Sequence, residues 1–398
     1  MELISRKIIC PFCFESFSVG QAEYRCINPH CPAKAEDAIY AKARGLTTKP
    51  SMGHIFRPSS GSWASKMMQK NLSARCDVCS KESSKRLCPY CHFELSHDAG
   101  LIDDRIIAII GGRDTGKGHY IATLIHRLEQ EVGSNFGFSL RMVGDETRRR
   151  FEEDYHAPLF RQKTLLQPTR SATVDITVKQ PMLFRLTFSY GRKLKAVNLT
   201  FFDSAGEDMQ SLDTMSTETR YICHASGIIF LLDPLQIEAV RQQVPTDILP
   251  KRDEGAEPTY IVERLRELFE RQSRLPATSK VKTPVAFVLS KIDTLLPILD
   301  AGSALLTTGE HFGHFNVADS QSVHTEIWSY LYSWMGGGFT SRVETNFGQY
   351  HYFGISSLGR PPDENRKVET VSPIRVEDPF LWILFQLGLI DKGKGSSP

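Results

Sequence analysis

One glycine-rich stretch constrains the fold of this chain more than any other feature. Residues 106–120 read IIAIIGGRDTGKGHY, so an apolar run ends at Gly111, and Gly116 and Lys117 follow at the spacing of a phosphate-binding loop. Such a loop, G-x-x-x-x-G-K-[ST], requires a buried strand before it and a helix after it. Apolar residues recur at helical spacing over residues 119–132, so both flanks fit. We therefore predict a strand, a phosphate-binding loop and a helix in succession.

The loop departs from this pattern at one position. The hydroxyl residue that should hold Mg²⁺ is replaced by Gly118, and the neighbouring His119 is a poor substitute because Mg²⁺ prefers oxygen ligands. Backbone N–H groups and the helix N-terminus are expected to cradle the phosphates, while the lysine reaches the terminal two. The residues predicted to contact the nucleotide here are Gly111, Asp114, Thr115, Gly116, Lys117, Gly118 and His119.

The loop also contains a positive charge. Arg113 could reach the γ-phosphate and supply its charge in cis, which is worth several orders of magnitude in rate when correctly aimed. Its alternatives are a side chain that faces solvent or an ion pair with Asp114. Both alternatives leave the arginine outside catalysis.

A second motif follows an apolar run in residues 197–209, VNLTFFDSAGEDM. It resembles the D-x-x-G element of GTPases, which faces the metal and senses the γ-phosphate. Asp203 would then hold Mg²⁺ through water. The backbone N–H of Gly206 would meet the γ-phosphate, because glycine lets the chain approach it closely.

The third motif, PVAFVLSKIDTL at residues 284–295, ends an apolar run in Ser290, Lys291 and Asp293. It resembles the guanine-recognition element [NT]-K-x-D of GTPases. A carboxylate accepts two hydrogen bonds from the ring N–H and the exocyclic amine of guanine, a donor pair that adenine lacks. Asp293 therefore favours GTP over ATP, and the stem of Lys291 would lie over the base. Ser290 in place of asparagine is expected to weaken the bracing of this loop.

The fourth motif lies in residues 350–359, YHYFGISSLG, where a predicted strand runs into Ser356 and Ser357. It resembles the last GTPase motif, in which a backbone N–H, here assigned to Ser357, meets the guanine oxygen. All four motifs come at the carboxyl end of a predicted strand. Open α/β sheets bind their ligands at those ends, so we expect one nucleotide site there.

Residues 100–392 accordingly resemble the Ras-like TRAFAC GTPases. Within that class, the cysteine-rich start, the QPT stretch and DSAGED resemble the bacterial double-GTPase families, which are regarded as switches in NTP-dependent conflict or defence systems. The resemblance implies a mostly parallel P-loop NTPase sheet with helices on both faces. It also implies GTP or GDP and Mg²⁺ as ligands, and an effector or activator protein as partner. No internal repeat is present, so a single GTPase domain is expected.

The resemblance further implies a threonine in the first switch loop that binds Mg²⁺ and senses the γ-phosphate. Thr169, in a polar stretch before a predicted strand, is the best match, and Thr164 and Thr173 are rivals. Glu207 stands where Ras-like GTPases usually carry a glutamine that orients the attacking water. A carboxylate cannot donate to phosphate and is repelled by it, so we expect slow or partner-dependent hydrolysis. The alternative is a pseudo-GTPase scaffold that does not hydrolyse GTP.

Cysteine usage indicates metal sites. Eight of the nine cysteines lie before residue 92 in a chain without a secretory signal, which favours metal over disulfides. Two knuckles can supply the four thiolates of a closed tetrahedral zinc site. We therefore predict two consecutive zinc ribbons. The first set is Cys10, Cys13, Cys26 and Cys31, with His30 as an alternative ligand, and the second set is Cys76, Cys79, Cys88 and Cys91.

These motifs predict a domain order. A first zinc ribbon is expected at 1–48, a connector at 49–72, a second ribbon at 73–99, the P-loop domain at 100–392 and a flexible tail at 393–398.

Charge and hydropathy bear on partners and compartment. The net charge of +2 gives no sign of a nucleic-acid or membrane partner. Residues 1–99 carry 14 Lys and Arg against 9 Asp and Glu, and each four-thiolate zinc site adds about −2, so nucleic acid is the less favoured partner. No apolar run reaches the ~20 residues of a membrane-spanning helix, and we expect a cytoplasmic protein.

Overall fold

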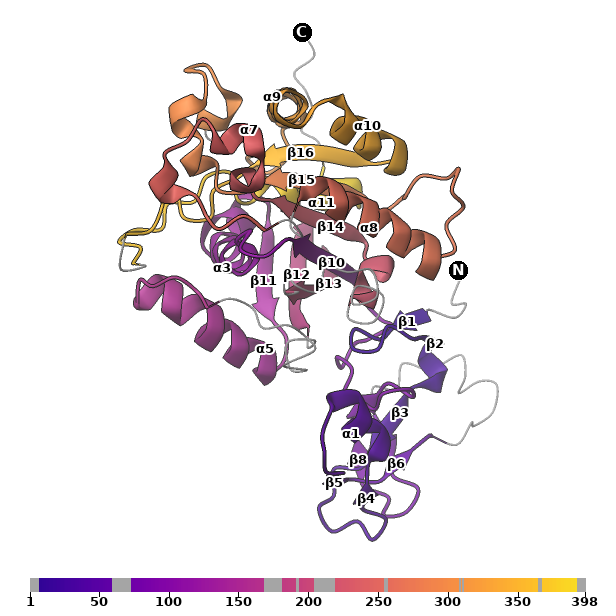
Figure 1. Cartoon of the computed structure of the whole chain (residues 1–398). Helices are drawn as coiled ribbons and strands as arrows, with labels where there is room; N and C mark the ends of the chain where they lie inside the picture. Colours follow the sequence, from indigo (N-terminus) through magenta and orange to yellow (C-terminus); the bar gives the residue numbers. More distant parts are fainter. Residues whose placement is uncertain are drawn as a thin grey trace. The chain divides into compact units, whose positions relative to one another are not determined.

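The structure, a computed structural model, describes residues 7–58, 73–167, 181–190, 193–203, 219–253, 257–307, 309, 311–363 and 367–391. The chain divides into two compact units. The first unit comprises Met1–Arg105 with Ala196–Thr200, and the second comprises Ile106–Lys195 with Phe201–Pro398. Figure 1 shows the elements of both units, coloured along the sequence.

A seven-stranded sheet, most of whose residues belong to the second unit, is the framework of this part of the chain. Its strands are β10 (Asp103–Gly111), β11 (Phe138–Met142), β12 (Met182–Tyr190), β13 (Lys193–Asp203), β14 (Gly227–Leu232), β15 (Val285–Leu289) and β16 (Tyr350–Gly354). The strand order is β11-β12-β13-β10-β14-β15-β16. β10, β14, β15 and β16 are parallel to one another, and β11 is antiparallel to β12. The predicted mostly parallel α/β sheet is therefore confirmed.

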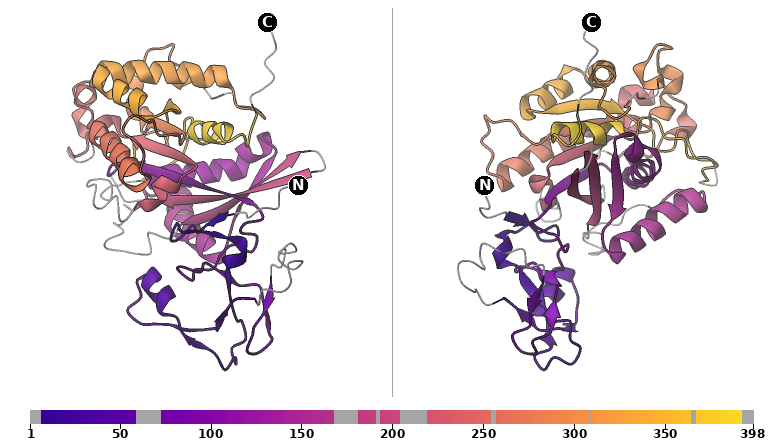
Figure 2. Two further views of the ribbon diagram at one scale, coloured as in Figure 1. Left: turned by 90° about the vertical axis from the view of Figure 1, so that its right-hand side faces the viewer. Right: turned by 180° about the vertical axis from the view of Figure 1, so that it is seen from behind.

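Helices cover both faces of this sheet. The α-helices are α3 (Lys117–Arg127), α4 (Gly133–Asn135), α5 (Asp145–Arg150), α7 (Glu238–Arg241), α8 (Pro258–Gln272), α9 (Val317–Met335), α10 (Gly337–Asn346) and α11 (Asp378–Gln386). Figure 1 shows α8 in front of the strands, and the rear view in Figure 2 shows α11 in front of them. Among the described residues, no helix combines the length and the apolar character needed to cross a membrane.

Shorter helical elements continue or connect these helices. The π-helical segments are η2 (Leu128–Val132), which extends α3, and η3 (Phe151–Arg161), which extends α5. The 3₁₀ turns are η6 (Arg220–His224), η7 (Pro234–Gln236), η8 (Thr246–Ile248), η10 (Ile292–Thr294), η11 (Leu296–Ile298) and η12 (Ala304–Leu306).

The central strands are buried on both faces, which explains their unbroken apolar sequences. Every residue of β14 and β15 is buried. Helix α11 packs so closely on β14 that a Cβ at Gly227 would lie 2.5 Å from Ile383 Cγ2. Phe201 of β13 and Phe380 of α11 add a ring contact at 5.9 Å. The core of the second unit therefore lies between the sheet and the helices on it.

The first unit consists of short strands and one helix. Its elements are β1 (Lys7–Ile9), β2 (Ser16–Ser18), η1 (Val19–Gln21), β3 (Glu23–Arg25), β4 (Ala35–Glu36), α1 (Ala38–Arg44), β5 (Ser51–Met52), β6 (Ile55–Phe56), β7 (Ala74–Arg75), β8 (Glu82–Ser83) and β9 (Arg86–Leu87). β3 pairs antiparallel with both β6 and β9, so early and late segments of the unit share one sheet.

A buried polar cluster links these segments. Arg25 Nη2 lies 2.7 Å from Asp37 Oδ2, and both side chains are almost fully buried. Asp37 also caps α1 by accepting from the backbone N–H of Tyr40 at 2.9 Å. His92 Nδ1 lies 2.8 Å from Asp37, and the carboxylates of Glu23 and Asp37 raise the pKa of His92. The cluster adds long-range links to a unit whose strands have only two or three residues each.

A half-buried histidine pair between β16 and α9 makes the second unit sensitive to acid. His351 stacks on His324 at 4.3 Å, lies 2.9 Å from Ser320 Oγ and stacks with Trp382 at 5.5 Å. Burial, with a smaller contribution from His324, lowers the pKa of His351 from 6.5 to about 4. Below pH 6.5 the unfolded chain takes up a proton that the folded state refuses. The stability that neutral His351 contributes is therefore fully present above pH 6.5 and is lost as the pH falls toward 4.

We expect His351 alone to remove about 3 kcal/mol of unfolding free energy between pH 7 and pH 4. Urea unfolding of the wild type and of His351→Gln at several pH values measures this loss. The variant should lose less stability than the wild type over the same range. Parallel pH dependences of the two proteins would show that His351 does not carry the effect.

Candidate functional site

The carboxyl ends of four parallel strands meet at one edge of the sheet. Gly111 at the end of β10 pairs with Leu231 of β14. Leu289 at the end of β15 pairs with Leu232 on one side and with Gly354 on the other. The glycine-rich loop and the third and fourth motifs therefore leave the sheet side by side. Open α/β sheets bind ligands at this edge.

The glycine-rich loop turns sharply from β10 into α3. A Cβ at Gly111 would lie 2.6 Å from the carbonyl oxygen of Leu231 and 2.8 Å from Thr115 Oγ1. Gly116 is the N-cap of α3 and has φ +86°, a left-handed conformation that favours glycine. The N-terminus of this eleven-residue helix, with its positive dipole end, thus opens directly onto the loop.

Lys117 and Thr115 brace the loop from within. Lys117 is buried, and its Nζ donates to the carbonyl oxygens of Gly111 at 3.0 Å and Gly112 at 2.8 Å. Thr115 Oγ1 donates to the carbonyl oxygen of Gly112 at 3.0 Å. A phosphate bound by this loop would meet a positive charge that is already in place.

The residue after Gly118 contacts the segment that leads to the predicted switch threonine. His119 Nε2 accepts a hydrogen bond from the backbone N–H of Leu166 at 3.1 Å. This nitrogen of His119 is thus engaged with the protein backbone, and contact between His119 and the nucleotide stays a prediction. Gly118 itself brings no side chain to the first turn of α3.

Arg113 faces solvent beside Asp114, as in the two alternatives to a catalytic role. Its side chain is 56% exposed, and its Nε lies 3.8 Å from Asp114 Oδ2. Asp114, at φ +58°, is equally exposed. An exposed pair of this kind contributes little to stability. A role for Arg113 at the γ-phosphate stays a prediction.

The third motif is anchored to the end of β14. Ser290 donates to the carbonyl oxygen of Leu232 from both its backbone N at 2.9 Å and its Oγ at 3.1 Å. Lys291 adopts a left-handed conformation, φ +55°, and its Nζ lies 2.7 Å from Asp233 Oδ2. The hydroxyl group of Ser290 thus makes a buried hydrogen bond, and the expectation that it braces this turn less well than asparagine stays a prediction.

The third and fourth motifs contact each other through Asp293 and Ser356. Burial raises the pKa of Asp293, and a hydrogen bond from the Ser356 side chain partly offsets this effect. Ser356 Oγ also accepts from the backbone N–H of Gly359 at 2.8 Å, and Ile292 N donates to the carbonyl of Ile355 at 3.1 Å. The raised pKa means that the ionised carboxylate is short of partners, so hydrogen-bond donors on a ligand would stabilise it.

Several predicted residues lie outside the described part of the chain. These are Thr169, its rival Thr173, Gly206 and Glu207. Asp203 is the last residue of β13, and its side chain also lies outside the description. Ser357 is half-buried next to Ser356. The rival Thr164 is described, and its Oγ1 donates to the carbonyl oxygen of Pro158 at 3.3 Å.

A buried arginine that no sequence motif contains ties together the segments that follow the third and fourth motifs. The side chain of Arg375 is 1% exposed and pairs with Asp319 at 2.8 Å and with Asp378 at 2.7 Å. It also donates to the carbonyl oxygens of Ala304 at 2.9 Å and Thr307 at 3.1 Å. Asp378 is three residues away, but Asp319, Ala304 and Thr307 are more than 50 residues away in sequence, so local patterns carry no signal for those contacts.

The same arginine braces the fourth motif through its neighbour. Ile374 and Ser356 exchange two backbone hydrogen bonds, at 3.0 and 2.8 Å. His311 joins Asp319 and Asp378 in a group whose ligand atoms lie within 4.8 Å of one another. Arg375 already neutralises both carboxylates, so this group is an ion-pair network rather than a cation site.

The eight N-terminal cysteines form two clusters, but the knuckles pair in a nested order, the outer two together and the inner two together. One cluster is Cys10, Cys13, Cys88 and Cys91, and the other is Cys26, Cys31, Cys76 and Cys79. The predicted grouping into consecutive ribbons is therefore wrong, because each cluster takes one knuckle from each half of the unit. Pairing of β3 with β9 brings the late segment beside the early one. His30 is exposed and belongs to neither cluster.

The geometry of both clusters fits zinc. The Sγ atoms are 3.6 Å apart for Cys10 and Cys91 and 3.5 Å apart for Cys26 and Cys79. A tetrahedral Zn–S distance of ~2.3 Å places the sulfurs about 3.8 Å apart. The backbone N–H of Phe12 donates to Cys10 Sγ at 3.4 Å, which suits a thiolate. Four thiolates close the coordination sphere, so such sites stabilise the fold and leave no open position for chemistry.

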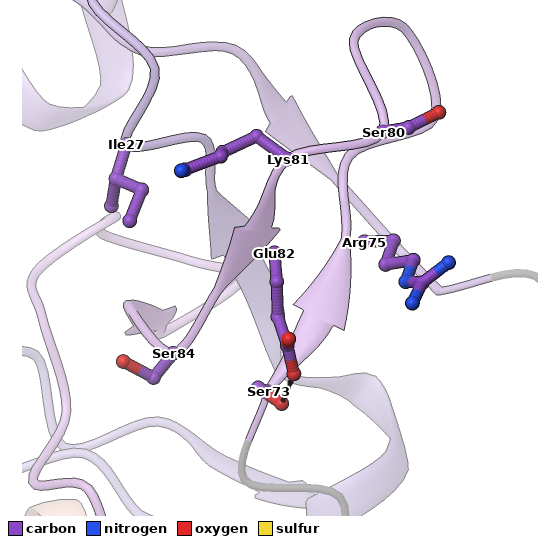
Figure 3. Close-up of a pocket in the computed structure, with 7 residues that line it drawn as sticks. All are labelled: Ile27, Ser73, Arg75, Ser80, Lys81, Glu82 and Ser84. Atoms are coloured by element: carbon purple, nitrogen blue, oxygen red, sulfur yellow. Dashed lines mark hydrogen bonds between the residues drawn. The ribbon is translucent and has the colours of Figure 1, made fainter.

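A shallow pocket on the first unit is lined around the β7–β8 hairpin. Figure 3 shows its lining residues, which are Ile27, Ser73, Arg75, Ser80, Lys81, Glu82 and Ser84. The Ser73 hydroxyl donates to the Glu82 carboxylate, and Lys81 extends toward Ile27. Charges of both signs line this pocket, so its composition selects no single class of ligand.

Comparison with known proteins places the chain in a family. Residues 105–331 match the family model Double-GTPase 2, and this span contains the glycine-rich loop and the third motif. The chain is also similar to a protein of Mycolicibacterium smegmatis described as "Putative ESX-1 scaffolding and assembly protein SaeC". The two are 30% identical over 325 residues, which cover 76% of this chain and 80% of the relative.

Proposed function

The chain belongs to the Double-GTPase 2 family, and from this premise we propose that it is a guanine-nucleotide-binding molecular switch. The observation that carries the proposal is the arrangement of phosphate-binding and base-recognition elements along one sheet edge. Lys117 would supply positive charge to the phosphates from within the loop. Asp293, oriented by Ser356, would accept the two N–H donors of guanine.

A bound Mg²⁺ would neutralise negative charge on the phosphates. Thr169 and Asp203 are the residues proposed to hold it, the first directly and the second through water. The loop offers little to replace the missing ligand at Gly118, because the buried hydroxyl of Thr115 is directed to the carbonyl of Gly112. A water molecule would take that ligand position, since Mg²⁺ readily keeps several waters.

The switch would work through the segments that bind the γ-phosphate. Thr169 and the backbone N–H of Gly206 would be ordered by GTP and released after hydrolysis. Glu207 can accept a hydrogen bond from the attacking water but repels the γ-phosphate. We therefore propose hydrolysis that is slow, or that depends on a partner protein which supplies the missing charge.

The test of the base assignment is nucleotide binding by the purified full chain. Calorimetric titrations with GTP and ATP in the presence of Mg²⁺ should show tighter binding of GTP. Asp293→Ala should remove this preference, because the paired acceptor for guanine is lost. Equal affinities for GTP and ATP in the wild type, or unchanged GTP binding by Asp293→Ala, would overturn the proposal.

Restoring the hydroxyl group by Gly118→Thr should tighten the dependence on Mg²⁺. A direct ligand in place of water is expected to lower the Mg²⁺ concentration that half-saturates GTP binding by about tenfold, or about 1.4 kcal/mol. Magnesium titrations of GTP binding measure this value, with Gly118→Ala as the control that adds a side chain without oxygen. If Thr and Ala behave alike, the hydroxyl is not what this position lacks.

The second candidate function is a scaffold that binds nucleotide without hydrolysing it. The replacement at Gly118 and the printed description of the relative, which speaks of scaffolding and assembly, both favour this alternative. Single-turnover hydrolysis separates the two functions. Release of phosphate from GTP by the wild type, abolished in Lys117→Ala, would reject the scaffold that does not hydrolyse.

Protein partners fit either function. The closed cysteine clusters would present rigid knuckles to a partner rather than carry out chemistry. We propose that an effector protein binds one nucleotide state of the chain. The relative's description, which speaks of scaffolding and assembly, also favours a protein partner. A part in a conflict or defence system remains a hypothesis from the family resemblance.

A further inference from the structure

We infer that Asp233 is a positioning residue for Lys291, and that it sets the affinity for guanine nucleotide without setting the choice of base. Asp233 follows β14 directly and belongs to none of the four motifs. Its side chain is 1% exposed, although it ends a strand at the ligand-binding edge. The inference rests on the proposed function and adds a residue to that site.

Both carboxylate oxygens of Asp233 are held. Oδ2 lies 2.7 Å from Lys291 Nζ, and Oδ1 accepts from the backbone N–H of Leu235 at 3.0 Å. Asp233 is the N-cap of η7, and Pro234 occupies the first position of that turn. Backbone contacts therefore orient the Asp233 carboxylate in the absence of nucleotide. Lys291 pairs with a carboxylate whose position is fixed.

Lys291 is in turn fixed at both ends. Its backbone is set by the two hydrogen bonds from Ser290 to the carbonyl of Leu232. Its ammonium group is set by Asp233, so the aliphatic stem between them lies in one place while remaining 30% exposed. A free lysine side chain carries about 2 kcal/mol of rotamer entropy. Holding the stem beforehand reduces the cost of placing it over a base.

In the ion pair, Lys291 also neutralises the negative charge of Asp233 near the phosphate loop. Leu231 of β14 pairs with Gly111 at the start of the loop, and Asp233 lies two residues further along the same strand direction. A buried carboxylate without its cation is strongly unfavourable, and here it would also repel phosphate. Loss of Lys291 therefore has two effects, because it removes the contact with the base and leaves Asp233 uncompensated.

The experiment is a double-mutant cycle on the full chain, with GDP and ADP as probes in calorimetric titrations. Asp233→Asn keeps the amide oxygen that accepts from Leu235 and removes only the charge. It should weaken GDP binding about tenfold while the ratio of GDP to ADP affinity is kept. Lys291→Met should weaken GDP binding further. The double variant should bind GDP more tightly than Lys291→Met alone, because the uncompensated carboxylate is gone.

Asp247→Asn, an exposed change of the same chemistry in the same unit, is the matched control and should leave GDP affinity unchanged. If Asp233→Asn fails to fold, Lys291→Arg tests the pair from the other side. Arginine can still pair with Asp233 and should lose less GDP affinity than methionine.

The inference is overturned if Asp233→Asn binds GDP as tightly as the wild type, if the double variant shows no recovery, or if Lys291→Arg and Lys291→Met are equally weak. These results leave the proposed function intact as long as the wild type prefers GDP to ADP and Asp293→Ala does not. A wild type without that preference would instead reject the proposed function itself.

Discussion

Replacing Cys10 and Cys88 together by serine should remove one zinc ion per chain, whereas replacing Cys10 and Cys26 together should remove both. The first pair belongs to one cluster, and the second pair takes one ligand from each cluster. Binding of a structural zinc contributes roughly 10–16 kcal/mol of folding free energy, so loss of a ligand pair should empty its site. Zinc content per chain, measured by native mass spectrometry, gives the answer directly.

The two double variants can be told apart by their zinc content because each cysteine cluster has an apolar core of its own, so that one cluster should keep its zinc when the other loses it. Phe17 and Leu95 are buried around the cluster that contains Cys10, while Tyr24 and Phe56 are buried around the other. Consecutive ribbons would give the opposite pattern, with one zinc lost from the Cys10 and Cys26 variant. Loss of both ions from both variants would contradict the independence of the two clusters.

Arg375→Met should destabilise the second unit by about 3–5 kcal/mol. The change leaves the carboxylates of Asp319 and Asp378 without their cation and the carbonyls of Ala304 and Thr307 without their donor. A buried ion pair that loses one partner is costly because the remaining charge is uncompensated. Urea unfolding followed by far-ultraviolet circular dichroism measures the loss.

The matched control is Arg342→Met. Arg342 pairs with Glu263 at 2.8 Å, but the two side chains are 46% and 45% exposed. Exposed pairs are worth about 1 kcal/mol or less, so this variant should be close to the wild type. If Arg375→Met does not fold, Asp319→Asn provides a milder change in the same network. Equal stability of the Arg375 and Arg342 variants would contradict the bracing role.

The sequence predicted the parts of this fold that are encoded locally. An unbroken apolar run is required of a strand buried on both faces. β10, β14 and β15 each show one, and in β10 and β15 it comes directly before a motif. Because the carboxyl ends of parallel strands lie at the same edge of a sheet, a motif after each strand was enough to predict that the motifs lie close together. Lys117 lies within the loop and bonds to its carbonyl oxygens, and its contact with phosphate stays a prediction.

The parts that depend on contacts distant in sequence could not be predicted in this way. Four similar cysteine knuckles do not specify which two share a metal, and the pairing of β3 with β9 decides it. Apart from Asp378, the partners of Arg375 are 56 to 71 residues away. Asp233 offered a weak signal, an acidic residue after a buried parallel strand, but its link to Lys291 spans 58 residues. The hydrogen bond from Ser290 to Leu232 also spans 58 residues, so the sequence carries no sign of it.

The most direct test of the central claim is competition between GTP and xanthosine triphosphate for the wild type and for Asp293→Asn. Xanthine carries a carbonyl oxygen where guanine carries the exocyclic amine. The asparagine amide can donate to that oxygen, whereas the aspartate carboxylate can only accept. The account predicts that the wild type prefers GTP and that Asp293→Asn prefers xanthosine triphosphate. An Asp293→Asn variant that keeps the wild-type preference for GTP would contradict it.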